Sequence, residues 1–148
     1  MVSTIDDVQT KAQRLHQDAL VCDVLLPLSK LMDHRLPLLS RQRENGCDFT
    51  SLTIIGDMAA QPGFVFASIA SSRRTLLSRP DDFVLAETVD DIRRAKREGR
   101  MAVNFHFQGT EAVGKDLSLV EAYYKLGIRF MLLAYNFRNN AGTGCLEE

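Results

Sequence analysis

The run Met101-Ala-Val-Asn-Phe-His106 is short and apolar, and it leads into the polar segment Phe107-Gln-Gly-Thr-Glu111. The periodicity then predicts a helix over residues 116–126 and a second strand over residues 128–134, which empties into the polar loop 135–145. In α/β proteins, polar clusters just past successive strand ends are where binding and catalytic groups lie. This stretch therefore predicts both the fold class and the place of a functional site.

The preceding residues follow the same alternation. We predict helices over residues 4–18, 38–45, 64–77 and 88–99, and strands over residues 19–26, 48–55 and 83–86. The first of these strands is a near-continuous apolar run, which is typical of a parallel strand buried on both faces. Repeated strand–helix units favour a mainly parallel sheet, either open or part of a closed barrel. No glycine-rich phosphate loop follows any strand, which weakens a nucleotide-binding interpretation.

Composition restricts the function classes. The 18 basic and 19 acidic residues give a net charge of −1, so no overall field recruits nucleic acid or an anionic membrane. Three widely spaced cysteines without a Cys-x-x-Cys pair argue against a disulfide framework or a structural zinc site. We see no signal peptide and no apolar stretch near the roughly 18 residues that span a bilayer. We therefore expect a cytoplasmic protein without nucleic-acid or membrane partners.

Residues 89–145 resemble the membrane (renal) dipeptidase family. The segment Asp90–Val103 is similar to a helix–strand passage of that family, and Phe107–Glu111 stands where the family has a Glu-Gly-Gly-His loop. Asp116–Phe130 resembles the helix and strand that follow, including a Leu-Gly-hydrophobic-Arg-aromatic step. The loop from Tyr135 to Cys145 resembles the one after the fourth barrel strand, and a fainter similarity extends over Leu20–Asp57.

The resemblance implies a (β/α)8 barrel that holds two zinc ions and hydrolyses dipeptides. Such a barrel takes roughly 250 residues, so 148 residues would supply its N-terminal half. We expect one partial barrel domain over residues 1–148, truncated relative to the family, with mainly parallel strands. Unpaired outer strands and an open apolar interior would make this chain self-associate, as a homo-oligomer or otherwise.

The metal site that the resemblance implies is altered in this sequence. The family has a His-x-Asp pair after its first strand, whereas this chain has Asp23-Val-Leu-Leu, and Asp23 matches the residue before that pair rather than a ligand. The bridging glutamate of the family falls on Gln108, a neutral amide that lacks the charge needed between two dications. A substrate-holding histidine falls on Tyr135, and the later histidine ligands would lie beyond Glu148.

Several residues remain candidates beside a structural interpretation. His106 could ligate a metal together with Gln108, or it could be a hydrogen-bonded core histidine, and Asp23 is a further metal candidate. Glu111 could be a general base, a displaced ligand or a solvated loop carboxylate, and Asp57 a polar contact or ordinary turn chemistry. Tyr135 and Asn136 are the predicted substrate contacts, although asparagines here also suit a turn held by side-chain-to-backbone hydrogen bonds.

Two functions remain open at this stage. The first is a dipeptidase-family metallohydrolase homologue with an altered or incomplete zinc site, which takes a dipeptide or a similar small peptide. The alternative is a non-catalytic protein that binds a small molecule or peptide on a degenerate barrel. Stoichiometric zinc would favour the enzyme, and its absence would favour the binding protein.

Overall fold

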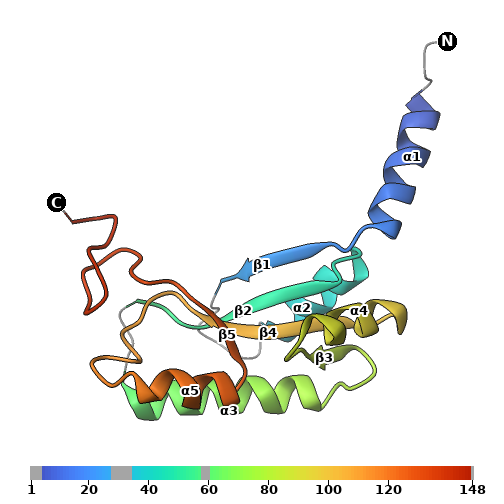
Figure 1. Cartoon of the computed structure of the whole chain (residues 1–148). Helices are drawn as coiled ribbons and strands as arrows, with labels where there is room; N and C mark the ends of the chain where they lie inside the picture. Colours follow the sequence, from blue (N-terminus) through green and yellow to red (C-terminus); the bar gives the residue numbers. More distant parts are fainter. Residues whose placement is uncertain (1–4, 28–34, 58–60, 148) are drawn as a thin grey trace.

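A computed structural model describes residues 5–27, 35–57 and 61–147. Helices and strands alternate along the chain after an N-terminal helix (Figure 1). The elements are α1 (Ile5–Asp18), β1 (Cys22–Leu26), α2 (Arg35–Glu44), β2 (Phe49–Ile55), α3 (Pro62–Leu77), β3 (Phe83–Leu85), α4 (Val89–Arg97), β4 (Met101–Phe107), α5 (Ser118–Lys125) and β5 (Ile128–Met131). Each strand and helix predicted from the sequence is present, with ends that shift by up to three residues. Ser3 and Thr4, residue types that favour helix N-termini, precede α1 and lie outside the described residues.

All pairings in the sheet are parallel. The strand order is β1-β2-β4, and the free edge of β4 is shared by two strands: β3 pairs with its first half and β5 with its second half. The pair Leu85–Val103 closes the β3 ladder, and the pair Phe105–Ile128 opens the β5 ladder. The series β1, β2, β4, β5 with helices between them is the arrangement of the N-terminal half of a (β/α)8 barrel.

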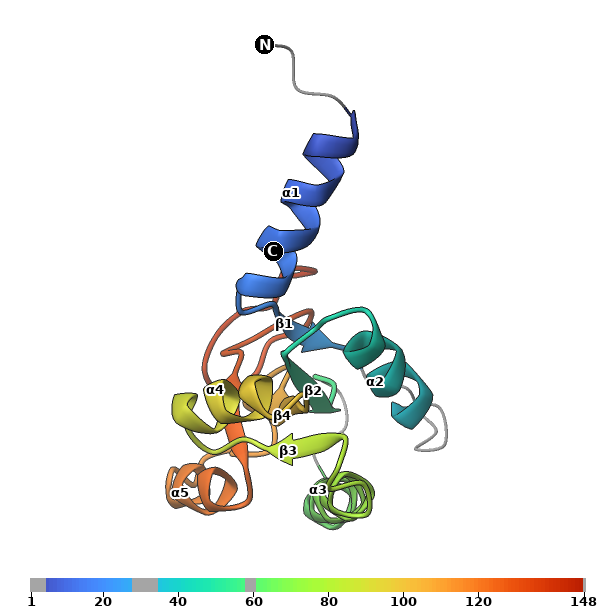
Figure 2. The same ribbon diagram turned by 90° about the vertical axis from the view of Figure 1, so that its right-hand side faces the viewer.

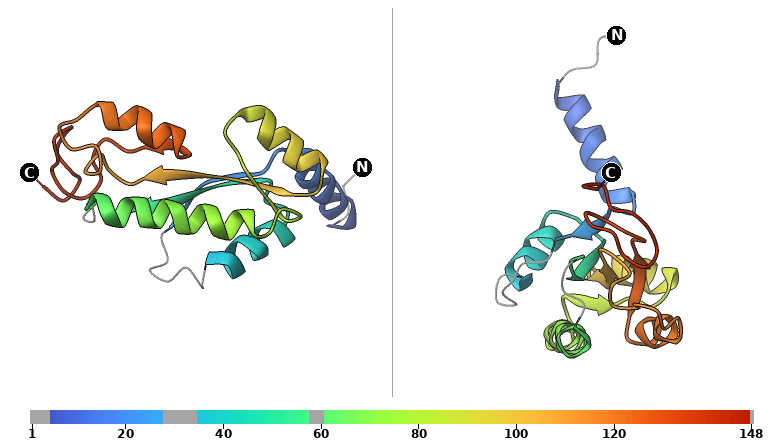
Figure 3. Two further views of the ribbon diagram at one scale, coloured as in Figure 1. Left: turned by 90° about the horizontal axis from the view of Figure 1, so that it is seen from below. Right: turned by 90° about the vertical axis from the view of Figure 1, so that its left-hand side faces the viewer.

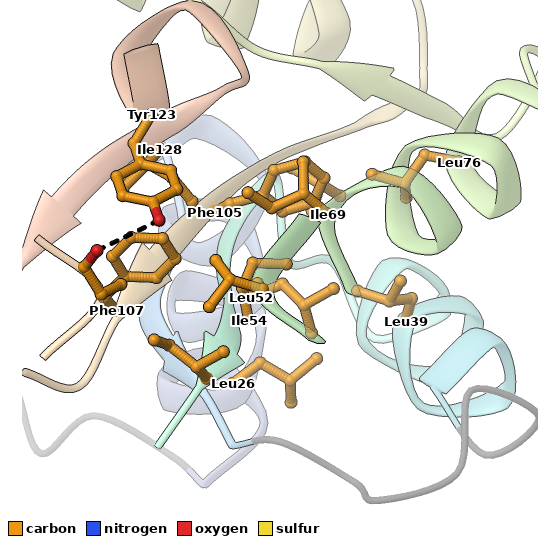
Figure 4. Packing of buried hydrophobic residues seen from close by; sticks show 14 of the residues in the cluster. Leu26, Leu39, Leu52, Ile54, Ile69, Leu76, Phe105, Phe107, Tyr123 and Ile128 are labelled. Atoms are coloured by element: carbon orange, nitrogen blue, oxygen red, sulfur yellow. Dashed lines mark hydrogen bonds between the residues drawn. The ribbon is translucent and has the colours of Figure 1, made fainter. Parts of the chain in front are cut away.

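The two faces of the sheet are chemically different. The face toward α3 and α5 carries the main core, in which aliphatic and aromatic side chains of β2 and β4 meet the helices (Figures 2 and 4). Phe107 packs edge-on against Tyr123 of α5, with ring centroids 5.0 Å apart, and the Tyr123 hydroxyl donates a hydrogen bond to the carbonyl of Ala112. The other face is largely polar in its middle, with four buried side chains: Ser51, Thr53, Asn104 and His106.

Local sequence determines where the helices begin. Thr88 caps α4, and its hydroxyl accepts a hydrogen bond from the amide of Asp91 while the Asp91 carboxylate accepts one from the amide of Thr88. A threonine followed three residues later by an acidic residue is a sequence pattern typical of such a capping box. Helix α3 begins two residues before the predicted start, because Pro62 occupies the first turn, where its missing N–H costs nothing.

The prediction that β1 is buried on both faces was wrong. The strand lies at the edge of the sheet and pairs with β2, and its first four residues are exposed, with Val24 at 61%. An apolar run shows that both faces of a strand could be buried. Burial also needs helices or strands that pack against both faces, and the described residues do not supply them. Its start is held by polar contacts instead: the Asp48 carboxylate accepts hydrogen bonds from the Val21 amide and from Lys96, each at 2.8 Å.

Strand β5 ends at Met131, although the apolar pattern predicted a strand to Ala134. The Leu132 amide still donates to the carbonyl of Phe107, but the next carbonyl, that of Leu133, accepts hydrogen bonds from two side chains, Thr110 and Asn139. Side chains therefore replace the strand ladder at this point. Within the described residues, no helix combines the length and the apolar character needed to cross a membrane.

Candidate functional site

The carboxyl ends of β2, β4 and β5 lie at one edge of the sheet, where their loops come together (Figure 1). Hydrogen bonds join the three loops directly. The backbone N–H of Gln108 donates to the carbonyl of Ile55 at 3.2 Å, and the backbone N–H of Asn136 donates to the Asp57 carboxylate at 2.8 Å. We call the polar residues of these loops the strand-end cluster, which consists of Asp57, Gln108, Thr110, Glu111, Tyr135, Asn136 and Asn139.

Gln108 lies between the loops that follow β2 and β4. It is half-buried, and its side-chain oxygen is in contact range of Gly56, since a Cβ placed on Gly56 would be 3.5 Å from that oxygen. The structure thus puts the side-chain amide of Gln108 beside Gly56. The resemblance assigns a bridging glutamate to this position, and here the group is neutral.

Glu111 supplies a carboxylate three residues further along the same loop. One of its oxygens accepts a hydrogen bond of 2.9 Å from the Asn139 side chain, which also donates to the Leu133 carbonyl at 2.7 Å. The other oxygen is buried against Gly109 and has no hydrogen-bond partner among the described residues. A buried, unpaired carboxylate oxygen is costly, so it is a ready acceptor for an N–H donor.

Tyr135 and Asn136, the predicted substrate contacts, lie in the loop after β5. The Cys145 amide donates to the carbonyl of Tyr135 at 2.7 Å, and the Leu146 amide donates to the carbonyl of Asn136 at 3.1 Å. The Tyr135 side chain is 43% exposed and the Asn136 side chain half-buried, so both reach the surface of the cluster. Their role toward a substrate stays a prediction.

Gly144 closes this loop. A Cβ at position 144 would meet the backbone of Asn136 and Phe137 far inside contact distance, whereas a Cβ at Gly142 would meet nothing within 4 Å. Backbone atoms cannot move aside as a flexible side chain does. Only glycine at position 144 therefore allows the two ends of the loop to approach this closely.

We expect Gly144→Ala to open the loop and Gly142→Ala to leave it closed. The measurement is amide hydrogen exchange at Cys145 and Leu146, whose hydrogen bonds to Tyr135 and Asn136 hold the loop. Protection at these two amides should fall at least about tenfold in Gly144→Ala, which corresponds to roughly 1.4 kcal/mol of local stability. Equal protection in both variants would show that the close approach does not hold the loop.

His106 lies in a chain of hydrogen bonds across the polar face of the sheet. Its Nε2 is 2.8 Å from the Thr53 hydroxyl, and its Nδ1 is 3.0 Å from the Ser51 hydroxyl. Thr53 uses its only hydroxyl proton on the carbonyl of Leu26, so its oxygen accepts from Nε2–H and Ser51 donates to Nδ1. Burial lowers the pKa of His106 and favours the neutral ring. Both ring nitrogens therefore bond hydroxyl groups. This is the arrangement of a hydrogen-bonded core histidine and not of a metal ligand.

The structure does not bring Asp23 to the strand-end cluster. Asp23 pairs with Thr50 in the sheet, whereas His106 pairs with Thr53, about 10 Å further along the strands. Its carboxylate accepts hydrogen bonds from the Gln42 side chain of α2 at 2.7 Å and from the Leu25 amide. Asp23 therefore fastens β1 to α2.

The donor set does not fit a two-zinc centre. Within residues 5–27, 35–57 and 61–147, no three histidine, cysteine, aspartate or glutamate side chains gather closely enough to hold a metal ion. The carboxylates of the cluster, Asp57 and Glu111, already accept hydrogen bonds from N–H groups, and Gln108 contributes no charge. Two adjacent dications need several anionic or imidazole ligands, which this part of the chain does not bring together.

Thr110 was not predicted to be part of the site, and the sequence indicated no specific partner for Asp57. Thr110 binds the Leu133 carbonyl, and Asp57 binds the Asn136 amide, so both join loops that are far apart in sequence. Their positions just after strand ends were visible in the sequence, but the partners depend on which strands become neighbours.

Comparisons with known proteins agree with this architecture. Residues 57–148, more than half of the chain, match the membrane dipeptidase family, peptidase family M19. An amidohydrolase from Pseudomonas aeruginosa superimposes with a TM-score of 0.82 at 25% identity, over 92% of this chain and 40% of that protein. A probable dipeptidase from the same organism gives 0.65 at 19% identity, again over 92% of this chain and 40% of that one.

A metallopeptidase from Rhodobacter sphaeroides, liganded with a phosphinate mimic of the dipeptide L-Ala-D-Ala, gives a TM-score of 0.55 at 17% identity, over 63% of this chain and 34% of that protein. The chain thus spans about 40% of the length of the first two solved structures that it resembles. No curated protein sequence matched. The family match, together with the half-barrel sheet, shows that this chain belongs to the membrane dipeptidase family of metallopeptidases.

Proposed function

We propose that this chain is part of a dipeptidase-family hydrolase homologue that takes a dipeptide or a similar small peptide and whose zinc site is altered. The observation that carries the proposal is the strand-end cluster itself. It lies at the end of the sheet where barrel enzymes bind their substrates, and it holds an amide, Gln108, at the position to which the sequence resemblance assigns the family's bridging carboxylate.

The cluster offers groups that suit the two ends of a short peptide. The half-buried Glu111 carboxylate supplies the negative charge that attracts an ammonium group, and the Tyr135 hydroxyl and the side-chain amides of Gln108 and Asn136 can donate to a carboxylate. Since no carboxylate bridge is available at position 108, these residues account for binding and orientation and not for activation of a metal-bound water.

A second candidate, a non-catalytic peptide-binding protein, is favoured by a specific observation. Asp57 and Glu111 are both engaged in hydrogen bonds that join loops, to the Asn136 amide and the Asn139 side chain. In this interpretation the carboxylates shape the binding surface. The two candidates differ in one measurable property, the amount of zinc per chain.

We expect the purified chain to bind fewer than two zinc ions and to hydrolyse Gly-D-Ala feebly at most. Gln108→Glu should raise zinc affinity but not restore activity, because it adds one carboxylate and no histidine. Native mass spectrometry gives the zinc stoichiometry of the wild type and of Gln108→Glu, and a dipeptide hydrolysis assay gives the turnover.

The matched control is Gln13→Glu, which makes the same change on the exposed helix α1. It should leave zinc binding as in the wild type. Two zinc ions per wild-type chain, with turnover that a chelator abolishes, would refute the altered site and point to Glu111, His106 and Asp23 as ligands.

A further inference from the structure

Helix α1 carries an apolar stripe that nothing in the described structure covers. Ile5, Val8, Ala12 and Leu15 follow one another at helical spacing, with Ile5 exposed by 79% and Leu15 by 69%, and no residue of the helix is buried. The helix projects from the body, as Figures 1 and 2 show. Only its end is tied down: the His16 ring contacts Gly46, and Lys96 donates a hydrogen bond to the carbonyl of Ala19 just beyond the helix.

A second uncovered apolar surface lies between α3 and α5. It is a groove of about 780 Å³, which we call the α3–α5 groove, and α3 supplies most of its wall. The lining residues that matter here are Phe66, Ala70, Arg73, Arg74 and Leu77 of α3 and Leu126 after α5. Phe66 and Leu77 are 44% and 62% exposed, so the groove offers apolar surface to an incoming helix.

The stripe and the groove match in length and in charge. Helix α1 has 14 residues and α3 has 16, which correspond to about 21 Å and about 24 Å. The first turn of α1 carries Asp6 and Asp7, and the last third of α3 carries Arg73 and Arg74. An antiparallel α1 would place its acidic end near the basic end of the groove, and antiparallel helices also align their dipoles favourably.

The two surfaces cannot meet within one molecule. Helix α1 extends away from the sheet beyond the edge strand β1, and α3 and α5 lie on the far side of the molecule, as the views in Figures 1, 2 and 3 show. Helix α1 of the same copy thus does not fill the groove, and a second copy of this chain carries a helix of the right length and polarity.

We propose that α1 of one copy docks antiparallel in the α3–α5 groove of the next copy. Because the two surfaces lie on opposite sides of the molecule, the contact is head-to-tail. In a pair of copies, one copy still has a free groove and the other still has a free stripe. Association is then open-ended. This differs from association through unpaired strand edges, which would not involve α1.

Two variants test the contact by complementation. Val8→Asp places a charge in the stripe, and Ala70→Asp places one in the groove; both positions are exposed, so neither change disturbs the core. Sedimentation velocity over a range of concentrations should show a rising mass for the wild type and a monomer for each variant alone. An equal mixture should give a 1:1 heterodimer and nothing larger, because it retains one intact stripe and one intact groove.

Two controls carry the same charge beside these surfaces. Gln13→Asp lies on the polar side of α1, and Ala67→Asp lies on α3 at an exposed position that does not line the groove. Both should associate as the wild type does. The proposal is overturned if the wild type stays monomeric, if Val8→Asp or Ala70→Asp alone still associates, or if the mixture remains monomeric.

Discussion

Replacing Phe107 with alanine should lower the free energy of unfolding by about 3–5 kcal/mol, the usual cost of deleting a fully buried aromatic ring. Phe107 is 0% exposed and packs edge-on against Tyr123 at the end of β4 (Figure 4). The cavity would lie directly beneath Gln108, so the loop that carries the strand-end cluster should also loosen. Urea unfolding followed by circular dichroism, at a concentration where the chain is monomeric, gives the loss of stability.

Phe64→Ala is the matched control for this change. Phe64 lies in the first turn of α3 and is 50% exposed, so the same deletion should cost less than half as much. Hydrogen exchange at the Gln108 amide, which bonds to Ile55, should rise in Phe107→Ala beyond the change in global stability. Equal losses in the two variants would show that Phe107 is not a core residue in solution.

His106→Gln should remove about 1–3 kcal/mol at neutral pH, because it takes away the two buried ring nitrogens that bond the Ser51 and Thr53 hydroxyls. It should also remove a pH dependence. Burial lowers the folded-state pKa of His106 below its ordinary value of 6.5, so below that pH the unfolded chain binds the proton more readily. The wild type is thus fully stabilised above pH 6.5 and loses stability as the pH falls, by at most about 1.4 kcal/mol per pH unit.

The measurement is the free energy of unfolding between pH 7.5 and 5, compared between wild type and variant. The difference in unfolding free energy between wild type and variant should shrink as the pH falls. Only the wild type has a buried ring that binds a proton less readily when folded than when unfolded. His16→Gln, at an exposed position where the ring contacts Gly46, serves as the control and should change with pH in the same way as the wild type. A constant difference between wild type and His106→Gln across this range would mean that the ring titrates as it does in water.

Much of the fold was predictable because it depends on local chemistry. The capping box of Thr88 and Asp91 and the β-branched run of β2 act within a few residues, and each appears where the sequence places it. The exposed edge position of β1 was not predictable, since an apolar run does not reveal how many neighbours a strand will have. The end of β5 depended on Thr110 and Asn139, side chains that take the Leu133 carbonyl from outside the strand.

The candidate site shows the same division. The position of Gln108 at a strand end followed from the sequence pattern, and the structure places it beside Gly56. The link between Asp57 and Asn136 spans 79 residues and arises only because β2 and β5 flank β4. Whether Tyr135 and Asn136 contact a substrate depends on a ligand, and so it stays a prediction.

Strand β4 has a consequence for how the chain opens and closes. It pairs with β2, β3 and β5, whereas β1 is joined to the sheet through β2 and α1 is tied at its last turn. Elements with few contacts to the rest of a protein open locally at a lower free energy than its centre does. We therefore expect α1 and β1 to detach at the lowest free energy. The strands β2 to β5 and the helices packed on them can then stay folded as a smaller stable unit while α1 and β1 open.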